Sequence, residues 1–236
     1  MPANLACRRD TRILIVEDHV LFAQSLGLSL SLEGYDVSLA IADRGESMES
    51  VRLAALRANA RIALLDLDLG GMGDGMWLIA PLAQSGTNVV VVTSSPDKGR
   101  WGACIHQGAR KVLSKGGPLQ DTLSTVRRLH RGLPVMSSVE RELLLESWRS
   151  RRTVTEDMRR RLALLTPRES QILGCLTQGH NVREIARIGV VSEATVRTQV
   201  KSILAKLAVS SQLAAVGMAH YADWKYDAQP SEPLRH

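Results

Sequence analysis

The sequence predicts two domains, an α/β domain with a parallel sheet and a smaller domain built only of helices. Three observations support this prediction. Up to about residue 131, short apolar runs alternate with amphipathic segments, which is typical of a doubly wound α/β domain. After residue 137 no pair of strand-like runs occurs. The basic residues are also concentrated in the second part of the chain.

Five apolar runs are predicted strands because they are short and continuous, as in strands buried on both faces of a parallel sheet. They are residues 12–16, 35–42, 62–65, 88–92 and 111–113. Each is followed by a segment with helical periodicity, and the five predicted helices are residues 19–32, 45–57, 75–84, 97–107 and 118–131. Pro118 stands where helices favour proline, in the first turn.

The second part of the chain contains helices only. Residues 138–148 are amphipathic, residues 150–154 are basic and polar and are interpreted as a hinge, and residues 156–165 form a further basic helix. Thr166, Pro167 and Glu169 then form a helix start with a capping box. The remaining predicted helices are residues 181–188, 193–207 and 211–221, before a tail that is rich in proline.

Composition limits the class of protein. Of 236 residues, 44% are hydrophobic and 23% are charged, so the chain can form a packed core and is not disordered throughout. Aromatic residues make up only 3%, which argues against a Tyr- and Trp-rich β-sandwich. Residues 149–225 contain 13 basic and 6 acidic residues, a net charge of +7 that leaves −1 for the remainder. This split indicates that the second domain faces a polyanion, although a solvated basic surface is the simpler alternative.

The cysteines and the apolar runs bear on the compartment. Cys7, Cys104 and Cys175 lie far apart and form no C-x-x-C pair, which supports neither a disulfide framework nor a zinc site and favours a reducing compartment. No apolar run approaches the roughly 18 residues that a membrane span needs. We therefore expect a soluble, cytoplasmic protein that does not bind membranes.

Acidic residues follow two of the predicted strands. Glu17 and Asp18 come after the first strand, and Asp66 comes after the third. In the flavodoxin-like strand order 2-1-3-4-5 these strands are neighbours, so the three carboxylates converge at the carboxyl edge of the sheet. Such a cluster is costly without a hard cation, and Mg²⁺ is the natural candidate.

Two further groups stand at strand ends. Thr93 ends the fourth strand with a hydroxyl, and Lys115 follows the fifth with an ammonium suited to a phosphate oxygen. Taken singly, each group has a simpler interpretation, because acids and threonine cap helices and a loop lysine usually faces solvent. Together they are the parts needed for phosphoryl transfer onto an aspartate.

Residues 12–131 resemble the receiver domain of bacterial two-component response regulators. The stretches that carry the resemblance are ILIVEDH (13–19), ALLDLDLGGMGDG (63–75), VVVVTSS (89–95) and GARKVLSKG (108–116). The resemblance implies that Asp66 is the phosphoacceptor and that Thr93 and Lys115 contact the phosphoryl group. It also implies that Mg²⁺ is held by Glu17, Asp18, Asp66 and the backbone carbonyl of Asp68.

This sequence departs from the family at two positions. Val112 stands where the family usually has Tyr or Phe, so no ring is available there to swing inward on phosphorylation. Gly70 stands where a proline commonly follows Leu69, which makes the loop more pliable.

Asp66 and Asp68 also resemble the D-x-D loop of haloacid-dehalogenase-type phosphohydrolases, in which the first aspartate attacks and the second is a general acid. That loop normally closes the first strand of its fold, whereas here it closes the third. The phosphohydrolase alternative also leaves Glu17 and Asp18 without a role.

The basic part of the chain contains a helix-turn-helix pattern. Residues 182–188 and 193–207 are joined by a short turn, with Ser192 as the cap of the second helix. Arg197 and Lys201 are four residues apart and share one face of that helix, opposite its apolar face, together with Thr198 and Lys206. Such a helix can enter the major groove of DNA, although a helical domain with a solvated basic face remains an alternative.

Residues 165–219 resemble the LuxR-type DNA-binding domain of NarL/FixJ-type regulators through LTPRESQIL (165–173), GHNVREIA (179–186) and VSEATVRTQVKSILAKL (191–207). The resemblance implies that Arg197, Thr198 and Lys201 approach bases. It also implies that four further residues lie near the DNA backbone or beside those base contacts, namely Glu193, Thr195, Gln199 and Lys206. The sequence departs from this family at four positions. Gln199 replaces a frequent His, Ser202 a frequent Asn, and Ala208 a frequent Gly. Gly189 replaces a core Leu and is expected to loosen the turn.

The combined prediction is a response regulator that is not an enzyme. The expected organisation is a receiver at residues 8–134, a linker at 135–160, a LuxR-type domain at 161–224 and a tail at 225–236. A sensor histidine kinase would phosphorylate Asp66, and a homodimer would then bind double-stranded DNA. The alternative that Val112 motivates is a phosphorylation-independent receiver that serves only for dimerisation.

Overall fold

The computed structural model describes residues 8–41 and 47–226. The start of the predicted helix at 45–57, the last residue of the predicted strand at 35–42 and tail residues 227–236 lie outside this range. The chain divides into two compact units, Met1–Arg149 and Ser150–His236.

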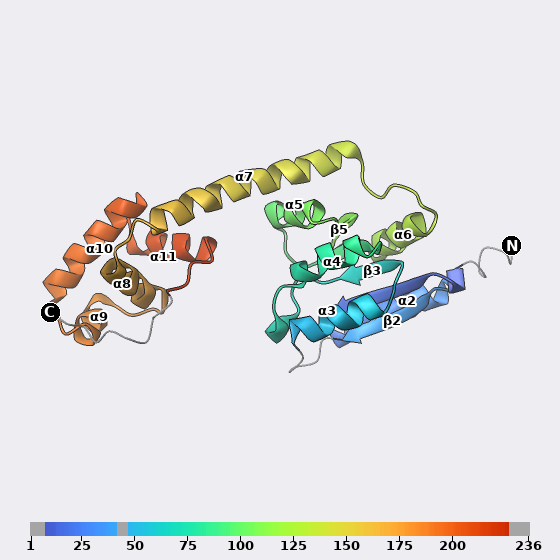
Figure 1. Ribbon diagram of the computed structural model, residues 1–236, viewed down its shortest axis with the longest axis horizontal. Coiled ribbons are helices and arrows are strands. Elements are labelled where there is room, and N and C mark those ends of the chain that lie inside the picture. The colour runs from blue at the N-terminus through green and yellow to red at the C-terminus, as the bar shows by residue number, and fades with distance from the viewer. Residues whose placement is uncertain (1–7, 42–46, 227–236) are drawn as a thin grey trace. The chain divides into compact units, whose positions relative to one another are not determined.

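The first unit contains a five-stranded parallel sheet (Figure 1). Its strand order, β2-β1-β3-β4-β5, confirms the predicted fold class. The strands are β1 (Arg12–Glu17), β2 (Asp36–Ile41), β3 (Ile62–Leu65), β4 (Asn88–Thr93) and β5 (Lys111–Ser114).

Helices cover both faces of this sheet. They are α2 (Val20–Leu32), α3 (Met48–Arg57), α4 (Ile79–Gln84), α5 (Lys98–His106) and α6 (Leu119–His130). Successive residues of a strand point to opposite faces. Ile13 and Ile15 accordingly pack with α2 and α6, whereas Leu14 and Val16 pack with α3, α4 and α5. The apolar runs are continuous because both faces of the sheet are buried.

The predicted helix at residues 75–84 is divided in the structure. Gly75–Leu78 forms a 3₁₀ turn, and α4 begins only at Ile79. Pro81 explains this division, because a residue without an N–H group is tolerated in the first turn of an α-helix but not further inside it.

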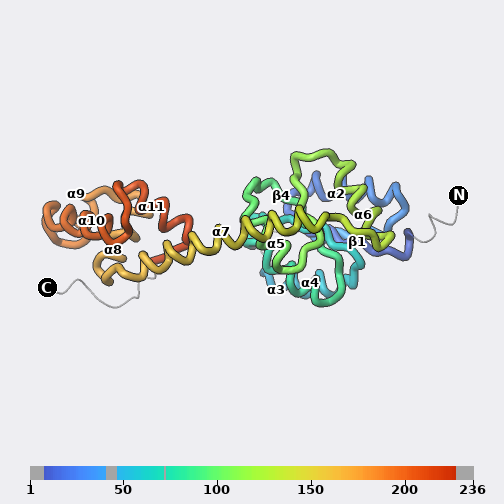
Figure 2. The backbone as a smooth tube through the Cα atoms, turned by 90° about the horizontal axis from the view of Figure 1, so that it is seen from above, coloured from blue at the N-terminus to red at the C-terminus, as the bar shows by residue number. Residues whose placement is uncertain are grey.

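The predicted hinge at residues 150–154 is wrong. These residues lie within α7 (Ser138–Leu162), one helix of 25 residues that Figure 2 shows as a continuous coil. The segment contains no Gly or Pro, and the ion pair between Arg152 and Glu156 joins successive turns of the helix. The boundary between the two units falls inside α7. Leu144 belongs to the core of the first unit and Leu162 to that of the second.

The separate helix predicted at residues 156–165 is instead the end of α7, which stops at Leu162. The described part of the second unit then contains the four further helices that the sequence predicts. They are α8 (Pro167–Thr177), α9 (Val182–Ile188), α10 (Glu193–Leu207) and α11 (Gln212–Tyr221). Thr166 and Glu169 form the expected capping box. In the described part of the chain no single helix is long and apolar enough to cross a membrane, and α10 and α11 reach that length together only across a 54° bend.

Candidate functional sites

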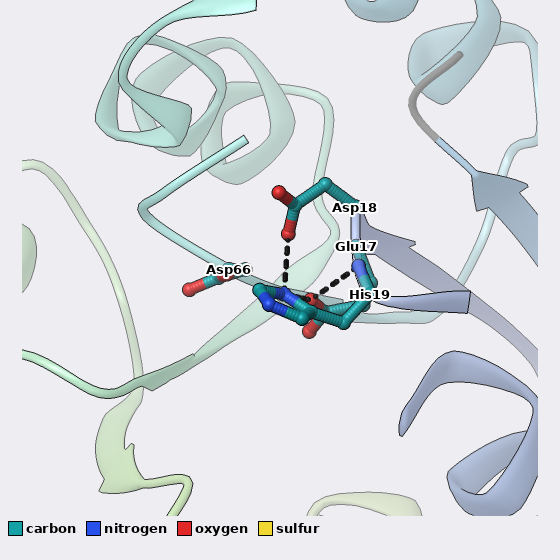
Figure 3. Close-up of side chains that lie close together, drawn as sticks. All are labelled: Glu17, Asp18, His19 and Asp66. Atoms are coloured by element: carbon teal, nitrogen blue, oxygen red, sulfur yellow. Dashed lines mark hydrogen bonds and ion pairs between the residues drawn. The ribbon is translucent and has the colours of Figure 1, made fainter. Parts of the chain in front are cut away.

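Glu17, Asp18 and Asp66 lie together at the carboxyl edge of the sheet, and we call them the acidic site. One ligand atom from each, and one from His19, lie within 4.8 Å of one another (Figure 3). Glu17 and Asp66 are only 2% and 3% exposed. The convergence follows from the register, because β1 and β3 pair in parallel with Val16 opposite Leu65. Asp66 continues this pairing by donating its N–H to the carbonyl of Val16.

Lys115 partly neutralises the acidic site. Its Nζ lies 2.6 Å from Asp66 Oδ2 and 2.7 Å from Glu17 Oε1. Burial opposes the charged form of Lys115, but the hydrogen bonds to Asp66 and Glu17 outweigh it, so its pKa is raised. Burial also raises the pKa of Glu17, against the opposing effect of the Lys115 hydrogen bond. One ammonium thus faces a group of three carboxylates.

Asp66 has one oxygen without a partner. Oδ1 is buried and accepts no hydrogen bond from any described residue. A buried carboxylate oxygen in this state is destabilising unless a ligand completes it. The donor set consists of three carboxylates at one sheet edge, which is the kind of oxygen-rich site that suits Mg²⁺. The residues present therefore fit a hard divalent cation.

The side chains of Thr93 and Asp68 do not belong to the group of three carboxylates in the acidic site. Thr93 is buried at the end of β4, where its Oγ1 accepts the N–H of Ser95 at 3.1 Å and so begins the following loop. Asp68 is exposed and pairs through its backbone with Asp74. Its side chain is outside the group that could hold a metal, and its predicted ligand is the backbone carbonyl.

Sequence reasoning missed two residues of this site. His19 donates its backbone N–H to Glu17 Oε1 at 3.0 Å, and its Nδ1 lies 2.8 Å from Asp18 Oδ1. Its place directly after the two acids is the signal that could have identified it. At Gly75, an added Cβ would lie 2.0 Å from the carbonyl oxygen of Asp66, so only glycine fits beside this residue. The Gly-rich loop at residues 70–75 carried that signal.

The exposed face of α10 carries most of the predicted DNA-contacting residues. Val196, Val200, Ile203 and Leu207 are buried against the other helices of the unit, which confirms the predicted amphipathicity. The predicted residues on the exposed side are Glu193, Thr195, Arg197, Thr198 and Lys201, whereas Gln199 is half-buried. Arg197 forms an ion pair with Glu193 at 3.3 Å, one turn earlier.

Lys206 points toward α8. Its Nζ lies 2.7 Å from Glu169 Oε2, and Ser202 donates its hydroxyl to Glu169 Oε1 at 2.7 Å. The Thr166 N–H also donates to this carboxylate. Burial opposes ionisation of Glu169, but these hydrogen bonds outweigh it and lower its pKa to about 2. Lys206 and Glu169 thus connect α10 to α8.

Gly189, which was expected to loosen the turn between α9 and α10, does not have an unusual backbone conformation. This residue has a right-handed backbone with φ −83°, so its conformation does not require glycine. An added Cβ would lie 2.5 Å from Arg168 Nη2, which shows that Arg168 occupies the space beside Gly189. The unusual backbone is at Val190 instead, which has φ +49° and is 86% exposed. A left-handed conformation is unfavourable for a β-branched residue.

Comparisons with known proteins agree with this arrangement. Residues 13–127 match the family of response regulator receiver domains, and residues 163–219 match the luxR family of bacterial regulatory proteins. The chain is 30% identical over 207 residues to the nitrate/nitrite response regulator protein NarP of Escherichia coli (strain K12), covering 86% of this chain and 92% of NarP. It is 28% identical over 210 residues to NarL of the same strain, covering 88% and 94%.

Among solved structures, the chain is similar to RcsB from Salmonella enterica serovar Typhimurium bound to promoter rprA. The TM-score is 0.47 at 22% identity, over 89% of this chain and 98% of that one. The fold, the acidic site and the family matches together define a DNA-binding response regulator of a two-component system. More narrowly, the chain belongs to the NarL family of transcription regulators, in which a receiver domain precedes a LuxR-type domain.

Proposed function

We propose that Asp66 accepts a phosphoryl group from a sensor histidine kinase and that this modification controls DNA binding by the second unit. The observation that carries the proposal is the buried Oδ1 of Asp66, which has no partner among the described residues although Oδ2 is held by Lys115. In this arrangement Lys115 orients one oxygen of the carboxylate, and no hydrogen bond from a described residue competes for the other.

The proposed transfer forms one bond and breaks another. An Asp66 oxygen attacks phosphorus, the P–N bond to the kinase histidine breaks, and that nitrogen retains the electron pair and takes a proton from solvent. Glu17, Asp18, Asp66 and the Asp68 carbonyl would hold Mg²⁺, which when bound neutralises charge on the phosphoryl oxygens. Lys115 pairs with one phosphoryl oxygen, and the Thr93 hydroxyl donates to another.

We further propose how α10 binds DNA. Arg197, Thr198 and Lys201 approach base edges in the major groove, and Glu193, Thr195 and Gln199 lie near the backbone or flank those contacts. Lys206 is paired with Glu169. In our proposal its main role is therefore to hold α10 against α8, and a contact with a DNA phosphate is secondary. Two copies of the chain bind paired half-sites about one helical turn apart, in the cytoplasm.

Asp66→Asn tests the phosphorylation proposal. Acetyl phosphate with Mg²⁺ should label the natural chain and increase its affinity for promoter DNA in a gel-shift assay, and Asp66→Asn should abolish both effects. Asp68→Asn is the matched control, because its side chain lies outside the acidic site and its backbone carbonyl is retained. Labelling of the Asp66→Asn variant would contradict the assignment of the acceptor.

A second candidate function is supported by Val112. This residue is 3% exposed and belongs to the core that β5 shares with α3, α4 and α5, so no aromatic side chain is present there to change position. In this alternative the receiver serves only for dimerisation. DNA affinity and dimerisation that are identical with and without acetyl phosphate would favour it, whereas turnover of a phosphomonoester would favour a phosphohydrolase.

A further inference from the structure

A cavity of about 480 Å³ lies in the first unit, at the edge of the sheet opposite the acidic site. Arg61, Asn88 and Arg110 line it from the amino-terminal ends of β3, β4 and β5. The other side is formed by Leu129 near the end of α6, residues 132–136, and Arg141 in the second turn of α7. The cavity therefore lies between the sheet and the connection that leads from α6 to α7.

The cavity carries an excess of positive charge. Three of its lining residues are arginines, and none is acidic. Among the described residues, the Arg61 guanidinium donates one long hydrogen bond of 3.4 Å, to the carbonyl of His130. Arg61 also lines a second pocket, which contains Asp10 and Asp36. Neither Arg110 nor Arg141 forms an ion pair with a described residue. The nearby carboxylate of Glu140 is already bound by Lys111 at 2.6 Å. All three arginines are exposed, so water screens their mutual repulsion, and their guanidinium groups can turn toward an anion in the cavity.

We propose that this cavity binds a small phosphorylated molecule of nucleoside-diphosphate size. Arginine donates paired hydrogen bonds that match phosphate oxygens, and the volume lies within the range of small-molecule sites. Leu129, Val135 and Met136 add an apolar surface for the uncharged part of the ligand. Asn88 Nδ2 is bound to the carbonyl of Arg61, which leaves its Oδ1 available as an acceptor. The apolar residues beside the arginines favour a small molecule with an uncharged part over the extended backbone of a nucleic acid or an acidic peptide.

A ligand in this cavity would connect the sheet to the start of α7. A ligand held by Arg61 and Arg110 on the sheet and by Arg141 on α7 joins the sheet to the first turns of that helix. Residues 132–136 are already fixed at one point, because Arg128 donates two hydrogen bonds to the carbonyl of Pro134. A ligand that binds only the folded chain raises its melting temperature, and the rise continues with the logarithm of ligand concentration above the Kd.

Calorimetric titration of the full chain with ADP tests the proposal. EDTA is present throughout, so that no metal–nucleotide complex can bind the acidic site. ADP should bind at least tenfold more tightly than inorganic phosphate at equal ionic strength. Arg110→Gln and Arg141→Gln should each weaken ADP binding about tenfold, because each removes charge-assisted hydrogen bonds.

Two controls separate this site from general attraction of anions. Arg57→Gln removes an exposed arginine of the same unit that does not line the cavity, and it should leave ADP affinity unchanged. Asp66→Asn should also leave it unchanged, which makes the test independent of the proposed phosphorylation. ADP affinity no greater than that of phosphate would overturn the proposal. Equal losses in Arg57→Gln and Arg141→Gln, or tighter binding of a polyglutamate peptide than of ADP, would also overturn it.

Discussion

At the scale of single residues, Lys115 stabilises the acidic site more directly than any other described side chain. It is the ammonium that contacts both Asp66 and Glu17, and both carboxylates are buried. The Phe22 ring lies 5.1 Å from its Nζ. The position of Lys115 depends on the backbone of β4, since its N–H donates to the carbonyl of Thr93 at 2.9 Å.

Lys115→Met should lower the free energy of unfolding by about 3 kcal/mol at pH 7, because it leaves two buried carboxylates without their ammonium. Millimolar Mg²⁺ should restore part of this loss by supplying another positive charge. Urea unfolding with and without Mg²⁺ measures both effects. Lys98→Met is the control, because Lys98 is exposed and lies over the Trp101 ring. An equal loss in both variants would contradict the prediction.

The ionisation of Glu169 should make the stability of the second unit depend on pH. Its pKa is about 2 in the folded chain and is ordinarily 4.5, so ionised Glu169 stabilises the fold above pH 4.5. This contribution is lost as the pH falls from 4.5 toward 2. Glu169→Gln should therefore destabilise the chain by about 2 kcal/mol at pH 7 and by much less near pH 2, as measured by urea unfolding.

Glu184→Gln is the matched control for Glu169→Gln. Glu184 occupies the same capping-box position in α9, but its side chain is 49% exposed and has no lysine partner. Its replacement should have a small effect at every pH. A loss for Glu169→Gln that does not depend on pH would show that packing, rather than charge, is responsible.

At the scale of elements, the contact between α5 and α7 is unusually close. An added Cβ on Gly102 of α5 would lie 1.9 Å from the carbonyl oxygen of Leu144 in α7. Beside this contact, His106 stacks on Trp148 with ring centroids 3.8 Å apart. A glycine inside a helix normally lowers stability, so its presence here reflects the close approach of the second backbone.

Gly102→Ala should destabilise the chain by about 1–3 kcal/mol, although alanine is the better helix former. The displaced contact should also change the fluorescence of Trp148. Gly217→Ala is the control, because Gly217 lies within α11 with nothing within 4 Å of an added Cβ. It should stabilise the chain by up to about 1 kcal/mol. Urea unfolding should therefore show a lower free energy of unfolding for Gly102→Ala and a higher one for Gly217→Ala. A higher free energy of unfolding in both variants would contradict the prediction.

The sequence predicted the strands because these depend on local patterns, and it predicted the acidic site because the flavodoxin-like strand order places the first and third strands side by side. Continuous apolar runs identified the strands, and the acids at their ends were brought together by strand order alone. The continuity of α7 was not predicted, because residues 150–154 are polar and the apolar residues that fix the helix lie at its two ends. The direction of Lys206 and the position of Arg168 beside Gly189 also depend on partners that are distant in sequence.

At the scale of the whole molecule, our proposal requires two copies of the chain to bind DNA through α10. Arg197→Ala and Lys201→Ala should each weaken specific binding by about 1–3 kcal/mol per half-site if they contact bases. Gel shifts against specific and scrambled duplexes measure this loss. Lys98→Ala in the first unit should leave both affinities unchanged. A footprint that the α10 variants do not alter would reject the assigned contacts.

The shared helix α7 determines how the two halves can be prepared separately. A fragment that stops before Ser138 would leave the apolar surface under Leu144 open to water, and one that starts after Leu162 would expose the core of the other half in the same way. Truncation between Arg149 and Ser150 leaves each fragment with its own portion of the helix. Fragments ending there should stay monodisperse, whereas those trimmed to the ends of α7 should aggregate.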